Sequence, residues 1–183
     1  MKKRLFVASD IPETMAGGFS AYQKTLSINQ ASWTKEEDYH LTIAFLGYVT
    51  GENIQSLERE VAAAASRAAS FELHFAKAIL APPGKDARMI WAKLAPSEQY
   101  SDLVGEIYAN TKPYITELVR TERIPHITLA RFREGVIINE KELTQPQLRQ
   151  KSFVVSEVHL FESKPSQVGA EYTKLTSFKL EGN

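Results

Sequence analysis

Hydrophobic and polar positions along the chain follow two different periods. Apolar residues recur at steps of three and four in three stretches, which predicts helices. Alternating or continuous apolar runs between them predict about seven strands. The predicted helices cover residues 15–26, 54–65 and 100–107, and the predicted strands cover residues 4–9, 40–46, 71–75, 88–94, 124–131, 153–161 and 172–180.

The order of these elements predicts an α+β fold. Hairpin-like pairs of strands favour largely antiparallel sheets with helices packed on one face, rather than a doubly wound parallel sheet. We expect Gly47 to end the strand that begins at His40, and Pro113 to end the third helix. A weakly helical stretch is interrupted by Pro146. No low-complexity linker divides the 183 residues, so we expect one domain.

Two of the predicted strands carry the same short motif. Residues 39–44 are Tyr-His-Leu-Thr-Ile-Ala and residues 125–130 are Pro-His-Ile-Thr-Leu-Ala, so that His, Thr and Ala match in register. The two histidines, His40 and His126, lie 86 residues apart, which is close to half the chain. This repetition indicates an internal duplication in which each half supplies one strand.

The strand period places the polar members of each motif on one face, because side chains at positions i and i+2 project together. The pairs that share a face are His40 with Thr42, and His126 with Thr128. If the strands lie side by side, two imidazoles and two hydroxyls converge on one pocket. Such a set suits a phosphate diester: one imidazole accepts a proton from water, the other donates one to the leaving oxygen, and the hydroxyls stabilise the phosphoryl oxygens.

The motif also has plainer interpretations. A single His-x-Thr on an apolar strand is usually structural, and only the duplication favours a site here. Zinc binding is disfavoured, because zinc takes three or four ligands and the sequence has no His-x-His, Glu-x-x-His or cysteine set. We therefore expect no metal.

Composition narrows the function further. The absence of cysteine excludes thiolate nucleophiles and Cys-ligated metals. Lys plus Arg and Asp plus Glu number 22 each, so the net charge is zero, whereas a protein that tracks a long nucleic-acid backbone is usually basic. If the chain acts on RNA, we expect it to bind an end of the RNA or a short fragment. The locally basic stretch 112–133 is either a solvated face or a surface that attracts phosphate.

The apolar run at the N-terminus is short. It stops at Asp10 and Pro12, which is too early for the core of a signal peptide or for a membrane span. We interpret this run as the first strand and expect a soluble, cytoplasmic protein without a membrane partner.

With its two motifs the chain resembles the 2H phosphoesterase superfamily and, within it, the bacterial and archaeal RNA 2′,3′-cyclic phosphodiesterases. The likeness runs nearly end to end. The matching segments are residues 4–8, Trp33, residues 40–47, 88–92, 125–131 and 169–175. The resemblance implies that residues 1–183 form a single bilobal domain: a pseudo-two-fold duplication with two antiparallel-rich sheets, helices outside and a central cleft.

The resemblance also implies an activity, namely metal-independent hydrolysis of a terminal ribose 2′,3′-cyclic phosphate to a 2′-phosphomonoester. It assigns His40 as the acid and His126 as the base, although the residues themselves do not distinguish the two. The implied phosphate-binding residues are Thr42, Thr128 and Arg131. No cofactor is implied. The expected partner is an RNA or oligonucleotide 3′ end with a cyclic phosphate, or a small cyclic nucleotide, and the expected state is a monomer.

Strand parity conflicts with the role implied for Arg131. His126, Thr128 and Ala130 share a face, so Arg131 should point away unless the strand has ended or contains a bulge. The equivalent position of the first motif is Phe45, which makes the two halves chemically unequal.

Two other functions stay open. The pocket could belong to a non-catalytic module that binds RNA ends, or to a phosphodiesterase that acts on a small nucleotide metabolite. Among the aromatic residues, Trp33 and Tyr172 could equally stack a base or pack in the core, and Phe6 is expected in the core. The remaining histidines, His74 and His159, look incidental because neither has a threonine two residues on.

Overall fold

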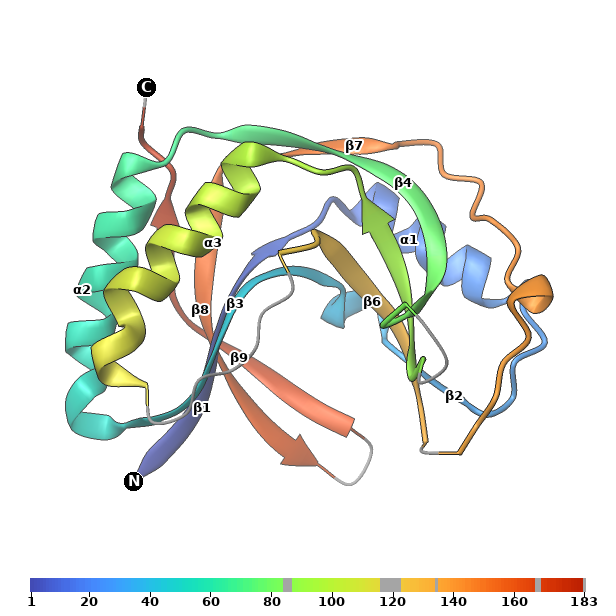
Figure 1. Cartoon of the computed structure of the whole chain (residues 1–183), viewed down its shortest axis with the longest axis horizontal. Helices are drawn as coiled ribbons and strands as arrows, with labels where there is room; N and C mark the ends of the chain where they lie inside the picture. The colour runs from blue at the N-terminus through green and yellow to red at the C-terminus, as the bar shows by residue number, and fades with distance from the viewer. Residues whose placement is uncertain (84–86, 116–122, 134, 167–168, 183) are drawn as a thin grey trace.

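The structure of this protein is a computed structural model, and it describes residues 1–83, 87–115, 123–133, 135–166 and 169–182. Among the described residues, nine strands form a strongly curled sheet, and three α-helices lie outside it (Figure 1). The strands are β1 Lys2–Asp10, β2 Ala31–Trp33, β3 His40–Thr50, β4 Phe71–Ala81, β5 Met89–Leu94, β6 His126–Phe132, β7 Ser152–Val155, β8 Glu157–Ser166 and β9 Gly169–Lys179. The α-helices are α1 Glu13–Gln23, α2 Gly51–Arg67 and α3 Glu98–Thr111, and three short 3₁₀ turns are Glu36–Asp38, Lys112–Tyr114 and Glu140–Glu142.

The sheet has two halves that meet between the two motif strands. Its order is β7-β4-β5-β6-β3-β1-β8-β9, with β2 added beside β6. Every pairing among the described residues is antiparallel. The central strands β6 and β3 share one pair of register partners, Leu41 and Ile127. The predicted α+β class is confirmed, and the two expected sheets are the two halves of one continuous sheet.

Helices α1 and α3 each follow a strand of one half of the sheet but pack against the other half. Helix α1 follows β1, but its Phe19 ring lies 6.0 Å from Phe75 of β4. Helix α3 follows β5, but the Tyr100 hydroxyl donates a hydrogen bond to the Thr42 carbonyl of β3 at 2.9 Å. This exchange ties the halves together (Figure 1) and holds β3 and β6 as neighbours.

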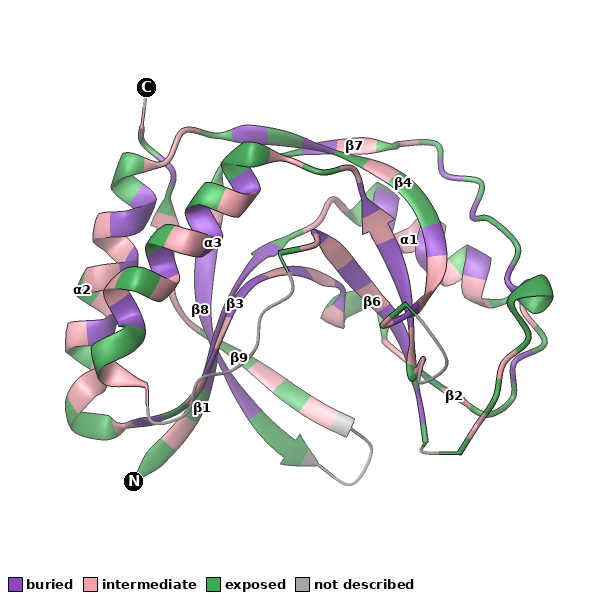
Figure 2. Ribbon diagram, viewed as in Figure 1, coloured by how far each residue is buried: buried purple, intermediate pink, exposed green. Residues whose placement is uncertain are grey.

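The main core lies between the sheet and the helices. Figure 2 shows buried positions along the central strands and on the inner sides of the helices. Leu41, Ile43, Ile127 and Leu129 of the motif strands are all fully buried in this core. The alternate residues therefore project to the other, concave face of the sheet. A smaller cluster of Phe6, Ala8 and Phe161 covers part of that face.

Several predicted boundaries needed correction. The stretch 153–161 is not one strand: β7 pairs with β4, whereas β8 pairs with β1 and β9, so the chain crosses from one half to the other near Ser156. Gly47 does not end the strand, because β3 continues to Thr50 through a register shift at which Gly47 has φ of 68°. Strand β2 was not predicted, since three residues are too few to show a period.

Candidate active site

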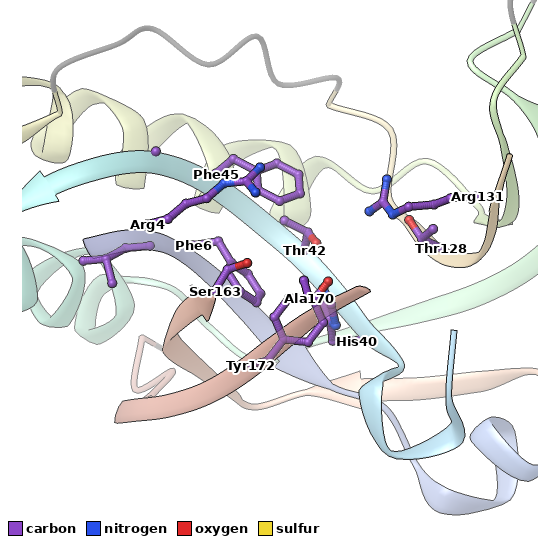
Figure 3. A pocket seen from close by; sticks show the side chains of 12 residues that line it. Arg4, Phe6, His40, Thr42, Phe45, Thr128, Arg131, Ser163, Ala170 and Tyr172 are labelled. Atoms are coloured by element: carbon purple, nitrogen blue, oxygen red, sulfur yellow. The ribbon is translucent and has the colours of Figure 1, made fainter. Parts of the chain in front are cut away.

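A cavity of about 520 Å³ opens on the concave face where the two halves meet. Both motif strands line it, and Figure 3 shows His40 and Thr42 from β3 opposite Thr128 and Arg131 from β6. Its other lining residues are Arg4, Leu5, Phe6, Phe45, Gly47, Ser163, Ala170 and Tyr172. A volume of this size is typical of small-molecule sites. The structure therefore brings four of the five predicted site residues to one cavity.

His126 does not line that cavity, but it stands on the same strand face beside it. Because Leu41 and Ile127 are register partners, the antiparallel pairing sets each histidine against the threonine of the other motif. The half-buried His126 ring is close enough to His40 for the charge of one to lower the pKa of the other. The two imidazoles are thus diagonal neighbours across the central strand pair.

Both imidazoles are held in the same way by their own strand. Nδ1 of His40 lies 2.7 Å from the carbonyl oxygen of Asp38, and Nδ1 of His126 lies 2.7 Å from that of Ile124. A carbonyl can only accept, so Nδ1 carries the proton in each ring. Nε2 is consequently the nitrogen available for proton transfer in both motifs.

A β-bulge resolves the conflict over Arg131. Along β5 and β6 the register passes from Ile90–Ala130 to Trp91–Thr128, so Leu129 is an extra residue that breaks the alternation. Leu129 and Ala130 are both buried, and Arg131 returns to the cavity face with Thr128. A bulge redirects the side chains that follow it, which is how position 131 reaches the site.

The first motif has the equivalent bulge. Along β1 and β3 the register passes from Val7–Ala44 to Ala8–Thr42, leaving Ile43 as the extra residue. Phe45 consequently faces the cavity, as Arg131 does in the second motif. The duplication therefore extends beyond the His-x-Thr pair to the backbone that follows it.

The surroundings of His40 are aromatic and acidic. Its ring centroid lies 5.2 Å from both Phe6 and Tyr172, and 6.4 Å from Phe161. Asp10 of β1 is its register partner across the strand pair. Burial, with a smaller contribution from Arg131, lowers the pKa of His40 from its ordinary value, and the hydrogen bond to the Asp38 carbonyl and the carboxylate of Asp10 act in the opposite direction.

The surroundings of His126 are aromatic and basic. The ring of Trp91 stacks on its imidazole with centroids 3.7 Å apart and planes 17° from parallel. Its register partner across β5 is Lys93, where His40 has Asp10. Burial, with a smaller contribution from Arg131, lowers the pKa of His126 to about 4. The free protein therefore holds His126 neutral at physiological pH.

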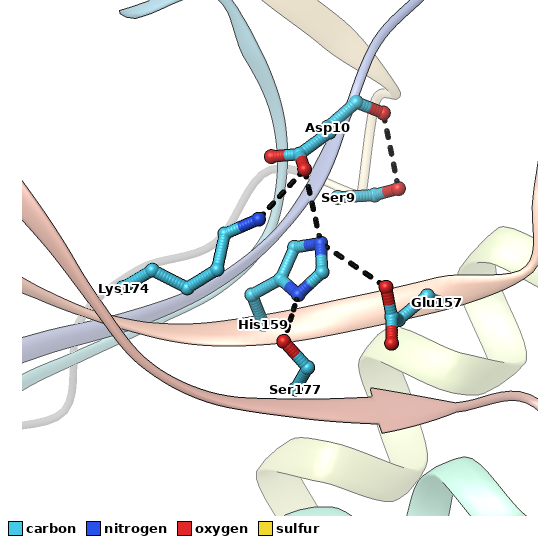
Figure 4. A network of polar contacts seen from close by, with 6 residues as sticks. All are labelled: Ser9, Asp10, Glu157, His159, Lys174 and Ser177. Carbon is cyan, nitrogen blue, oxygen red and sulfur yellow. Dashed lines mark hydrogen bonds and ion pairs between the residues drawn. The ribbon is translucent and has the colours of Figure 1, made fainter.

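The fourth histidine, His159, is built into a polar network next to this site (Figure 4). Its Nε2 lies 3.2 Å from Asp10 Oδ2, and its Nδ1 lies 2.8 Å from the Ser177 hydroxyl. Lys174 also donates to Asp10, at 2.7 Å. The network fixes the carboxylate that faces His40, although the sequence had marked His159 as incidental. By contrast, the His74 side chain is 61% exposed and pairs only with Glu72 among the described contacts.

Within the described part of the chain, no group of three or more His, Asp or Glu side chains is arranged to hold a metal ion. No helix among the described residues is long and apolar enough to cross a membrane.

Solved structures of other proteins share this fold. They include LigT of Escherichia coli in complex with 3′-AMP (TM-score 0.79, 24% identity, covering 98% of this chain and 99% of that one). They also include TT0787 of Thermus thermophilus (TM-score 0.83, 24% identity, 98% of each chain). The fold is therefore that of LigT-like proteins.

The family model of LigT-like phosphoesterases matches residues 6–91. An RNA 2′,3′-cyclic phosphodiesterase of Methanothermobacter thermautotrophicus is 27% identical over 98% of this chain and 100% of its own length. One from Geobacillus stearothermophilus is 28% identical over 82% of this chain, which spans about half (48%) of that relative. These findings confirm the predicted resemblance: the family model of LigT-like phosphoesterases covers the first motif, and the whole chain has the LigT-like fold.

Sequence reasoning missed Asp10, Trp91 and Lys93. Each lies beside a motif histidine on the neighbouring strand, so no local spacing in the sequence connects it to the site. The only signal for Trp91 was its place in a segment that carried the family resemblance. Asp10 and Lys93 had none, because a cross-strand register is visible only in the folded sheet.

Proposed function

We propose that this protein hydrolyses a terminal ribose 2′,3′-cyclic phosphate to a 2′-phosphomonoester. One observation carries the proposal: two imidazoles from repeated motifs, each with Nδ1 tied to its own backbone, stand together beside a cavity lined by the matching threonines. The names of the Methanothermobacter and Geobacillus relatives support the same chemistry.

The proposed reaction needs water and two proton transfers. Neutral His126 accepts a proton at Nε2 from the water that attacks phosphorus. The bond from phosphorus to the ribose 3′-oxygen breaks, and protonated His40 donates its Nε2 proton to that oxygen. One P–O bond forms and one breaks, leaving a 2′-phosphomonoester and a 3′-hydroxyl. Each transfer contributes about 10²- to 10⁴-fold to the rate.

The charges around the two rings support this division of roles. The base must be neutral in the free enzyme, and His126, with its pKa lowered to about 4, meets that requirement. The acid must carry a proton. Burial and Arg131 lower the pKa of His40 as they do that of His126, and Asp10 is the one carboxylate among the groups acting on either ring that raises it. The anionic phosphate of a bound substrate raises the pKa of both rings, and because Asp10 acts on His40 in the same direction, the proposal places the proton of the bound state on His40.

The remaining predicted residues provide donors for the phosphate. The hydroxyls of Thr42 and Thr128 and the guanidinium of Arg131 line the same cavity. Charge builds on the non-bridging oxygens in the transition state, where such donors have their largest effect. The same cavity is also lined by the rings of Phe45 and Tyr172, which offer faces for a base.

We further infer that residues 1–183 act as one domain and that a monomer suffices, because the motifs of a single chain line the cavity. The lack of cysteine suits a reducing cytoplasm.

The test is turnover of adenosine 2′,3′-cyclic phosphate with and without EDTA. We expect the 2′-phosphate as the product, with a rate that survives EDTA. His40→Ala and His126→Ala should each lower kcat by about 10²- to 10⁴-fold, and the double variant should lose little more, because both residues serve one step.

His74→Ala is the matched control, since this histidine is exposed and lies outside the cavity lining. Melting curves should show that all variants stay folded. Near-normal turnover by either motif variant would overturn the assignment of acid and base, and binding without any turnover would favour an RNA-end binding module instead.

A further inference from the structure

A second cavity, of about 440 Å³, adjoins the first. The two share Arg131, Ala170 and Tyr172 as lining residues. Its far wall is the segment around β2, and its near wall is the start of β9. Each cavity alone has the volume of a small-ligand site. A molecule that fills the first cavity and leaves past Arg131 therefore enters the second.

The second cavity offers the groups that recognise a nucleoside. Trp33 is half-buried, so part of its indole is available to stack on a base, as is the ring of Tyr172. Base–aromatic stacking accepts any base, because every base has a π-face. The exposed carboxylates of Glu37 and Glu171 can accept hydrogen bonds from ribose hydroxyls or exocyclic amino groups.

The wall that carries Trp33 is fixed to the second motif strand. Trp33 is the register partner of Ala130, and the Thr34 hydroxyl donates to the Thr128 carbonyl at 2.9 Å. The Thr34 amide also donates to the Leu129 carbonyl at 2.9 Å. An occupant of the second cavity would thus be held in a set position relative to Thr128 and Arg131.

The charges limit what the occupant can be. Arg131 stands at the junction, and Lys35, whose side chain is 67% exposed, lies on the far wall. The carboxylates of Glu37, Asp38 and Glu171 repel a polyanion. The cavity consequently suits one nucleoside joined through a single phosphate, and disfavours a long backbone.

We propose that the second cavity is the subsite for the nucleotide that precedes the one bearing the cyclic phosphate. The substrate is then an oligonucleotide end, with at least two nucleotides held. This inference rests on the proposed function of the first cavity.

The experiment compares adenosine 2′,3′-cyclic phosphate with an adenylyl-adenosine dinucleotide that ends in a 2′,3′-cyclic phosphate. We expect the dinucleotide to have a kcat/KM about 5- to 100-fold higher, the effect of one base–aromatic stack. Trp33→Leu should bring the ratio of the two kcat/KM values close to one. A merely structural defect would lower both values and leave their ratio unchanged.

A second pair of variants tests whether the positive charge of Lys35 contributes to binding of the dinucleotide. Lys35→Gln should lower the ratio by about 2- to 3-fold and reduce its salt dependence, because a single-strand phosphate contact contributes about −0.7 to the slope of log affinity against log salt. Lys24→Gln, at an exposed lysine outside both cavities, is the control and should leave the ratio as in the wild type.

The outcomes separate the two proposals. Equal kcat/KM for the two substrates in the wild type would overturn the second subsite and leave the proposed function standing. A preference that Trp33→Leu does not alter would also overturn it. Turnover of neither substrate would overturn the proposed function, and this inference with it.

Discussion

The two motif strands, β3 and β6, have nearly the same backbone but different neighbouring side chains. In each, the imidazole Nδ1 bonds to the carbonyl two residues earlier at 2.7 Å, and a bulge follows the threonine. Duplication therefore reproduced the parts of the site that depend on the backbone. The side chains that neighbouring strands present to each ring are what differ.

The differences fall at equivalent positions. Opposite His40 stands Asp10, whereas Lys93 stands opposite His126. After the bulge, the first strand presents Phe45 to the cavity and the second presents Arg131. An acid–base pair needs one ring that retains its proton and one that does not, and two identical strands cannot provide both. The asymmetry of the site therefore comes from residues outside the motif.

Within this comparison the largest effect should come from Arg131, which follows the bulge of the second motif, and not from Phe45, which follows that of the first. Arg131→Met removes the guanidinium from the phosphate and should lower kcat/KM for adenosine 2′,3′-cyclic phosphate by about 10²-fold. Phe45→Leu should lower it by about 3-fold, because only ring packing is lost. Steady-state kinetics of both variants measure the difference. Equal losses would contradict the division into a phosphate side and a base side.

The two threonines should behave alike, in contrast to the residues after the bulges. Thr42→Val and Thr128→Val each remove one neutral hydrogen-bond donor while nearly preserving shape. Each should lower kcat by about 3- to 10-fold. Serine at the same positions keeps the hydroxyl and should restore most of the rate. A loss in one valine variant alone would show that the repeated geometry does not mean a repeated role.

Asp10→Asn tests what fixes His40 as the acid. The carboxylate raises the pKa of His40, so its removal lowers that pKa, and the protonated acid is lost at a lower pH. The alkaline limb of the kcat/KM profile should therefore move to lower pH, and by less at high salt, because Asp10 is solvent-exposed.

The acidic limb belongs to His126 and should stay in place when Asp10 is changed. A shift of that limb instead would mean that the roles of the two histidines are reversed.

The smallest effect is expected from Lys93→Gln. Lys93 is the register partner of His126 but is not among the groups that set the pKa of His126, so removing this cation should move the acidic limb upward only slightly, if at all. The shift is small because burial, and not Lys93, is the main cause of the low pKa of His126. A pH profile at low salt measures it, with Lys24→Gln as the neutralised-lysine control.

Much of this site was visible in the sequence. Residues 40–44 and 126–130 share a pattern that period-two strands convert directly into paired side chains on one face, and the structure has both strands at these positions. The second and third helices were also clear, because Leu57 and Val61, or Leu103 and Ile107, repeat at helical spacing and are buried. The first was less so, because Gly17 and Gly18 interrupt its pattern, and it ends at Gln23 rather than at Leu26. Local periodicity specifies which side of an element faces the core, and that information lies within a few residues.

What local periodicity could not specify was the contribution of residues far apart in the chain. The bulges at Ile43 and Leu129 break the strand parity that the sequence seemed to require, and they exist only because β1 and β5 pair with the motif strands in that register. The same pairing sets Asp10 against His40 and Lys93 against His126. The crossing between β7 and β8 separates two segments that the sequence pattern predicted as one strand.

The local order of residues was enough to specify the motifs, the helices and the class of fold. The register of antiparallel pairing, which joins residues tens of positions apart, sets which neighbour each histidine has.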